Sequence, residues 1–210
     1  MANVTIKQPV LDRKNFMFVD QKDSVLIKKP GELFGKNFKI KNLKNCKVYL
    51  LDYTSGLFVD DCDDCNFVIA PCSGSVFIRT SNRCNVYIIS KQLRFRDCYN
   101  MNIYGYVPSD PVIESSDNFI FAPYNFKFPK LKELFISAKF NPGENKIEKI
   151  YDFCPKEGET HFKWITGSLE ILNLENGILS SDEFGENEYP YENYDIEILN
   201  FYGLNIVDVK

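Results

Sequence analysis

A repeat of 17 to 19 residues organises the middle of this sequence. Five seven-residue segments can be superimposed, and their first residues are 19, 19, 17 and 18 positions apart. These first residues are Ile40, Val59, Ile78, Phe95 and Ile113. A period of this length, combined with alternating apolar positions, is typical of a solenoid in which each repeat forms one coil. The repeat therefore predicts which side chains lie inside the coil and which point outward.

Within each repeat the apolar residues alternate as they do in β-strands. Apolar or small residues also recur two positions before, three after and six after each first residue. The last of these columns is Cys46, Cys65, Cys84, Met101 and Phe119. Asn, Asp or Arg precedes each member of that column, as a polar corner between short strands requires. The sequence therefore predicts an all-β fold, a right-handed parallel β-helix of about five coils.

Three regions are predicted along the chain. Residues 1–36 are expected to be extended lead-in strands that pack on the solenoid. Residues 37–166 form the β-helix domain, and residues 130–139 have the pattern of a short amphipathic helix that caps its C-terminal part. Residues 167–210 are an acidic, aromatic extension without a clear period.

Charge is distributed unevenly between these regions. Residues 170–210 contain ten acidic residues and one lysine, whereas the whole chain has a net charge of −4, so residues 1–169 carry a net charge of +5. No basic cluster is interleaved with stacking aromatic residues, so nucleic acid is not an expected partner. The acidic C-terminal end is interpreted as a solvated tail, and the alternative is a tail that binds a partner.

The seven cysteines are expected to be reduced and to pack inside the coils. No secretory signal or membrane-spanning run is present, and Ala2 stands where N-myristoylation needs glycine, which predicts a cytoplasmic protein without an intrinsic membrane anchor. Cys62 and Cys65 have the spacing of a zinc knuckle, but a second cysteine pair at a matching distance is missing. No metal site is therefore predicted.

The outward positions form two neighbouring columns. One contains Phe58, Phe77 and Arg94, and the next contains Arg79, Arg96 and Glu114. Exposed phenylalanines need a cover, which is either a partner or the N-terminal segment of the chain. Glu114 is expected to pair with Arg96 and to leave Arg94 freer.

A catalytic triad is not expected in a chain with a single histidine, and no phosphate-binding glycine loop is present. An exposed arginine such as Arg94 is usually a solvated or pairing side chain. Its alternative role is an arginine finger, which is inserted into the nucleotide site of another protein and stabilises charge on the transferred phosphoryl group.

Several motifs resemble the tubulin-cofactor-C domain family. The main ones are Gln92-Leu-Arg94-Phe-Arg96-Asp-Cys98 and Pro111-Val-Ile-Glu-Ser-Ser116, supported by Ile150-Tyr-Asp-Phe-Cys-Pro155. The similarity extends from about residue 12 to residue 166. One departure is Lys91, where the family usually has a glutamine.

This resemblance implies a GTPase-activating protein (GAP), which is an activator rather than an enzyme with its own substrate. It implies that Arg94 is the finger and that Glu114 supports it, with Gln92 beside them. Arg96, Phe58, Phe77 and Arg79 are the expected partner-binding residues. GTP and Mg²⁺ would be bound by the partner, so no cofactor of the chain's own is expected.

The expected partner is an Arf-like small GTPase in its GTP form. The chain is expected to bind it as a monomer, and the process is expected to be ciliary or membrane trafficking of lipidated cargo. The resemblance places such a protein in the cytoplasm, at the ciliary base or on the cytoskeleton. Two alternatives stay open. The first is a cofactor-C-like GAP that acts on tubulin, and the second is a non-catalytic scaffold for a GTPase or a cytoskeletal protein.

Overall fold

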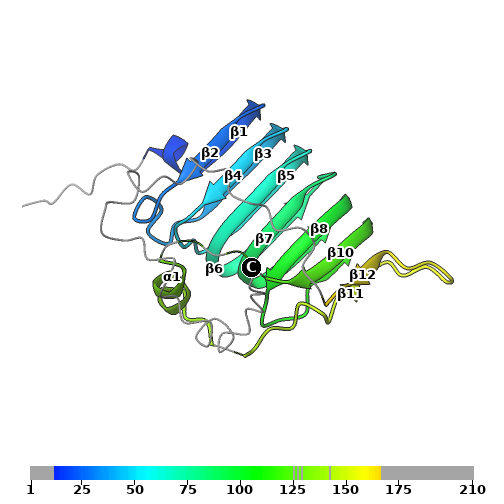
Figure 1. Ribbon diagram of the computed structural model, residues 1–210. Helices are drawn as coiled ribbons and strands as arrows, with labels where there is room; N and C mark the ends of the chain where they lie inside the picture. Colours follow the sequence, from blue (N-terminus) through cyan, green and yellow to red (C-terminus); the bar gives the residue numbers. More distant parts are fainter. Residues whose placement is uncertain (1–11, 125, 127, 129, 142, 167–210) are drawn as a thin grey trace, which may run out of the picture.

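The protein is a parallel β-helix in a computed structural model that describes residues 12–166 except 125, 127, 129 and 142. Figure 1 shows the strands stacked as successive rungs, with β1 at one end and β12 at the other. Every strand pairs in parallel with the strands of the neighbouring coils. The predicted coils are present, and the solenoid has about six turns because strands on both sides of the repeats extend it.

The solenoid has two faces. The first face is formed by β1 (Met17–Lys22), β3 (Phe38–Lys44), β5 (Leu57–Asp63), the second halves of β6 (Asn66–Arg79) and β7 (Asn85–Arg96), β9 (Val112–Glu114) and β11 (Tyr151–Asp152). The second face is formed by β2 (Val25–Lys28), β4 (Lys47–Leu50), the first halves of β6 and β7, β8 (Tyr99–Tyr106), β10 (Asp117–Pro123) and β12 (Phe162–Trp164).

The interior follows the predicted register. Ile40, Val59, Ile78, Phe95 and Ile113 are all buried and are paired in one column across the first face. The column of three cysteines, Met101 and Phe119 is buried as well. Burial of about 25 cal/mol for each Å² of apolar surface makes these columns the main source of stability.

Two residues at the corner of each coil adopt the left-handed conformation. The second of them is the polar residue predicted from the repeat: Asn45, Asp64, Arg83, Asn100 and Asn118, with φ between 50° and 58°. Asn and Asp tolerate this region because their short polar side chains bond locally. Arg83 has no such advantage, but its guanidinium reaches Asp63 and Asp64, each at 2.6 Å.

The expected lead-in strands pair with the first predicted coil. A short 3₁₀ helix, η1 (Arg13–Phe16), precedes β1, and Phe18 pairs with Ile40 and Leu26 with Val48. Residues 17–28 therefore form a coil of their own. The division of the chain at residue 36 stays a prediction, and the predicted extension 167–210 lies outside the described residues.

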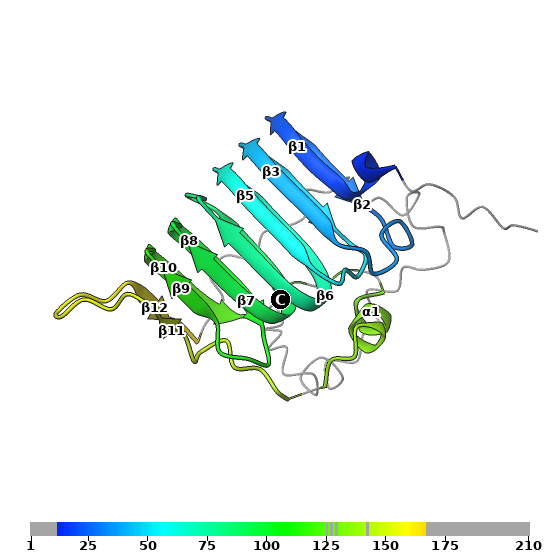
Figure 2. The same cartoon turned by 180° about the vertical axis from the view of Figure 1, so that it is seen from behind.

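The expected helix is α1 (Leu131–Ser137), but it covers a side of the solenoid, next to β6, instead of capping its C-terminal part. Figure 2 shows it beside the middle of the stack, far from the last strands. Its buried residues Leu131, Leu134 and Phe135 join a second apolar core with outward residues of the second face, among them Tyr87 and Tyr104. The two tyrosine rings are stacked, with centroids 4.4 Å apart.

Candidate functional site

The candidate site is the outer surface of the first face. Strand pairing places Arg94 between Phe77 and Val112, and it places Arg96 between Arg79 and Glu114. Because side chains alternate along a strand, both arginines point outward while Phe95 between them is buried. The structure thus brings the predicted site residues into two adjacent columns.

Phe58, Phe77 and Arg94 form a continuous stack. The rings of Phe58 and Phe77 are nearly parallel, 12° apart, and their centroids lie 6.0 Å from each other. The guanidinium carbon of Arg94 lies 5.6 Å from the centroid of Phe77. This cation–π geometry contributes about 0.5–1 kcal/mol at an exposed position. It also holds the guanidinium against the surface at the edge of an apolar patch.

Phe58 remains 41% exposed, so the described residues leave much of this stack open. The N-terminal residues 17–28 extend the ladders instead of crossing the phenylalanines. Among the residues that the structure describes, Arg94 has no carboxylate partner. Its guanidinium is therefore available to a protein that docks on this face.

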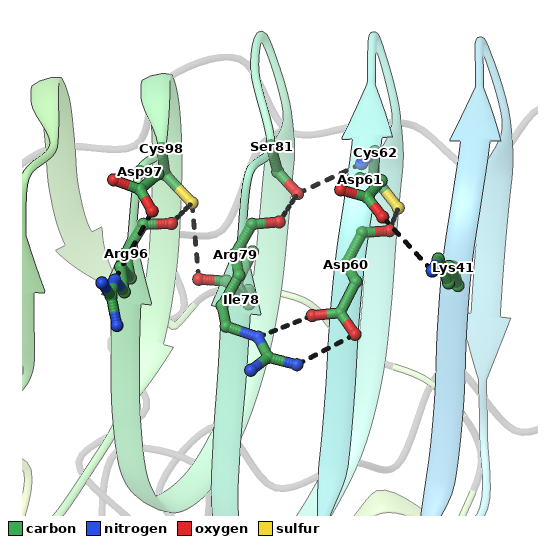
Figure 3. A network of polar contacts seen from close by, with 10 residues as sticks. All are labelled: Lys41, Asp60, Asp61, Cys62, Ile78, Arg79, Ser81, Arg96, Asp97 and Cys98. Carbon is green, nitrogen blue, oxygen red and sulfur yellow. Dashed lines mark hydrogen bonds and ion pairs between the residues drawn. The ribbon is translucent and has the colours of Figure 1, made fainter.

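The two arginines of the next column are paired with carboxylates, as Figure 3 illustrates. Arg79 donates two hydrogen bonds to Asp60, at 2.7 and 3.1 Å, in the fork geometry that makes such pairs specific. Arg96 lies 3.5 Å from the carboxylate of Asp97 and 3.9 Å from that of Glu114. The expected contact between Glu114 and Arg96 is thus an ion pair beyond hydrogen-bond distance.

Gln92 lies on the same strand as Arg94, two residues earlier, and also points outward. Ser75, its neighbour on β6, donates a hydrogen bond of 2.6 Å to its side-chain oxygen. This bond fixes the carboxamide of Gln92 on the outer surface. Lys91, at the position where the family usually has a glutamine, turns toward the ring of Phe140, 6.0 Å from its centroid.

Two exposed aromatic residues extend this surface and were not predicted as site residues. Tyr151 pairs with Val112 and thereby continues the column of Arg94. Tyr151 is 57% exposed and Phe153 is 61% exposed, and their rings meet edge to face at 6.3 Å. The signal for them was the motif at residues 150–155, but its sequence alone did not place it beside Arg94.

The buried cysteines have structural surroundings. The thiol of Cys65 donates to the carbonyl of Asp63 and that of Cys84 to the carbonyl of Asn82, each at 3.2 Å. Burial raises the pKa of Cys62 to about 12 and that of Cys98 to about 11, so these thiols are protonated at neutral pH. The described residues contain no group of three or more His, Cys, Asp or Glu side chains suited to a metal ion.

The described part of the chain also contains no helix that is both long and apolar enough to cross a membrane.

Several known proteins are similar to this chain in sequence, and one solved structure is similar in fold. The "Protein XRP2" of Danio rerio is 31% identical over 167 residues, which is 80% of this chain and 44% of that protein. The human "Protein XRP2" is 32% identical over 152 residues, covering 72% and 43%. The human "Tubulin-specific chaperone C" is 26% identical over 136 residues, covering 65% and 39%. The chain thus spans less than half the length of these curated relatives.

A solved structure of Tubulin Binding Cofactor C from Leishmania major is similar in fold, with a TM-score of 0.51 and 18% sequence identity. The similarity covers 71% of this chain and 88% of the chain in that structure. At this identity the likeness concerns the fold. The family model described as "Tubulin binding cofactor C" matches residues 35–153, which include the whole candidate surface from Phe58 to Phe153. The chain belongs to the tubulin binding cofactor C family.

Proposed function

We propose that this chain is a GTPase-activating protein for an Arf-like small GTPase in its GTP form. Arg94 is the arginine finger, and GTP and Mg²⁺ are held by the partner. The observation that carries the proposal is the placement of the Arg94 guanidinium on an exposed face, over Phe77 and without a carboxylate partner among the described residues. Arg79, which is held by Asp60, is less suited to this role.

The residues around Arg94 would contribute to docking of the GTPase in different ways. Phe58 and Phe77 offer apolar area next to the finger, and Tyr151 and Phe153 offer more on its other side. Buried aromatic residues are the usual anchors of protein interfaces. Gln92, held by Ser75, presents a fixed polar group near Arg94. Glu114 supports the finger indirectly, since its ion pair is with Arg96.

In the GTPase, Arg94 would stabilise charge that develops on the γ-phosphoryl group in the transition state. Fingers of this kind accelerate hydrolysis by about 10³ to 10⁵. This corresponds to about 4–7 kcal/mol of transition-state stabilisation. The resemblance to family members that act on Arf-like GTPases supports this partner. The location proposed with it is the cytoplasm, at the ciliary base or on the cytoskeleton.

The test is single-turnover GTP hydrolysis by a panel of Arf-like GTPases. We expect wild type to accelerate one of them by about 10³ or more, and Arg94→Ala to lose this acceleration. Arg94→Lys should also lose most of it, because lysine keeps the charge but lacks the planar fork. Since the side chain is exposed, Arg94→Ala should change the free energy of unfolding by less than about 1 kcal/mol.

The matched control is Arg83→Asn, which removes an exposed arginine away from the site. Three other coils have asparagine at this corner position, so the variant should keep its fold and full stimulation. Stimulation that survives Arg94→Ala would contradict the finger. Retained GTPase binding without any acceleration would favour the scaffold alternative.

A second candidate target is tubulin. It is favoured by the name of the family and by the match to tubulin-specific chaperone C. The same variants should then be assayed for GTP hydrolysis by tubulin in the presence of the other tubulin-folding cofactors. Acceleration there, with none for the Arf-like panel, would transfer the role of Arg94 to this partner.

A further inference from the structure

The last coil ends the apolar core with a charged residue. The central inward column of the first face runs through Phe18, Ile40, Val59, Ile78, Phe95 and Ile113, and β11 continues it with Asp152. A carboxylate at an inward position requires a partner, because burying an unpaired charge is costly. Figure 1 shows β11 and β12 at this end of the stack, joined by a loop that projects away from it.

His161 is the partner of Asp152. Its Nδ1 lies 2.7 Å from one carboxylate oxygen, and the side chains are only 9% and 16% exposed. The other oxygen of Asp152 accepts a hydrogen bond of 2.9 Å from the backbone N–H of Cys154. The carbonyl of His161 accepts one of 3.0 Å from Phe119 on β10. The contact thus ties β11, β12 and the loop between them to the preceding coil.

Holding Asp152 inward also determines where its neighbours point. Side chains alternate in an extended segment, so Tyr151 and Phe153 must face outward when Asp152 faces the core. This segment pairs with β9 over two residues only, and the N–H groups of Tyr151 and Phe153 donate to the carbonyls of Pro111 at 2.7 Å and Ile113 at 2.9 Å. The contact with His161 adds a side-chain anchor to this short strand and thereby helps to hold the exposed aromatic pair in place.

We propose that the Asp152–His161 pair positions Tyr151 and Phe153 for docking the partner GTPase, and that docking weakens as the pH rises. His161 is a positioning residue, since it lies in the last coil and acts through Asp152 on the two aromatic side chains. This inference rests on the proposed function, because it assigns the aromatic pair to the same docking surface as Arg94.

Three acidic side chains around His161 favour its protonated form, and together they outweigh the opposing effect of burial. Asp152 is the largest cause that raises the pKa of this imidazole, followed by Glu159, whose carboxylate lies 3.5 Å from Nε2, and by Asp117 on β10. Lys156 pairs with Glu159 at 3.2 Å. The pair stabilises the last coil fully below about pH 6.5, the ordinary histidine pKa, and this contribution is lost as the pH rises through the higher pKa of the folded state.

The first part of the test needs no partner. His161 is the only histidine and Trp164 the only tryptophan, so one imidazole NMR signal and one fluorophore report on this coil. Between about pH 5.5 and 8.5 we expect the imidazole to titrate above 6.5 in wild type and closer to 6.5 in Asp152→Asn. Trp164 fluorescence should follow the same titration. An unshifted imidazole in wild type would overturn the proposal.

The second part measures stimulated GTP hydrolysis by the partner GTPase near pH 6 and pH 8. We expect His161→Ala to raise KM about tenfold with an unchanged saturated rate, because Arg94 is intact. His161→Gln keeps an amide donor for Asp152 but does not titrate, so it should restore most of the affinity. It should also remove the part of the pH dependence that comes from this coil.

Two outcomes would count against the positioning role alone. The first is that the KM of wild type depends on pH in the same way as the KM of His161→Gln. The second is that His161→Ala lowers the saturated rate and leaves KM unchanged. Failure of the proposed function is distinguishable from both. In that case no GTPase would respond to wild type, although the His161 titration without a partner would still be shifted.

Discussion

At the scale of single residues, the neighbour across the strand decides what each arginine can do. Arg79 faces Asp60 and is held by two hydrogen bonds, whereas Arg96 lies between acidic side chains at longer distances. Arg94 has Phe77 and Val112 as its neighbours, so it rests on a ring and keeps its donors free among the described residues. The three arginines thus differ in role because each has different side chains beside it.

Gly74 offers a prediction at this scale. A Cβ atom added there would lie 2.1 Å from the backbone carbonyl oxygen of Ser55, which cannot move aside without shifting the coil. We expect Gly74→Ala to lower the free energy of unfolding by about 1–3 kcal/mol, as overpacking does. The measurement is urea denaturation.

The control for Gly74→Ala is Gly56→Ala. Its Cβ would meet the side-chain oxygen of Asn37 at 2.9 Å, and that side chain can rotate away. The control should therefore lose clearly less stability. Equal losses would contradict the close approach of the coils at Gly74.

At the scale of elements, each coil is built from the same corner. A residue in the left-handed conformation precedes a small buried residue. The S–H or O–H group of this small residue donates a hydrogen bond to the backbone carbonyl two residues earlier in the chain. Ser81, for example, donates to the carbonyl of Arg79 at 2.9 Å and accepts from the N–H of Cys62 at 3.3 Å. Neighbouring coils are thereby connected by side chains as well as by strand pairing, which Figure 3 shows for this corner.

Cys65 tests the stacked register of these corners. It is 1% exposed and lies between Cys46 and Cys84 in one column. Cys65→Lys would place an unpaired charge in the core, and we expect a loss of about 3–5 kcal/mol in the free energy of unfolding. Cys65→Ala, which removes only the small thiol, should lose roughly 1 kcal/mol. Equal melting temperatures of Cys65→Lys and wild type would disprove the register.

At the scale of the whole molecule, a solenoid is stabilised mainly between neighbouring coils. The central strands β6 and β7 have 14 and 12 residues and belong to both faces, whereas β11 and β12 have two and three. Stability is therefore expected to fall toward the C-terminal end. The proposed docking surface includes both the rigid middle, with Arg94, and this weaker end, with Tyr151 and Phe153.

Native-state hydrogen exchange should reveal this gradient. We expect the amides of β11 and β12 to exchange well before those of β6 and β7, because short end strands open locally without unfolding the rest. Raising the pH through the titration of His161 should widen the difference beyond the intrinsic effect of pH on exchange. Uniform protection of all coils would show that the end coil is as stable as the middle.

The sequence by itself determined the β-helix, the inward columns and the outward direction of Arg94, since a period near 18 residues and the alternation of strands leave little choice of register. Only the tertiary structure decided that α1 covers a side of the solenoid and that Tyr151 continues the column of Arg94. The physical reason is distance along the chain. Local periodicity specifies each coil, but contacts between the repeats and residues 124–166 depend on how the non-repetitive chain returns to them.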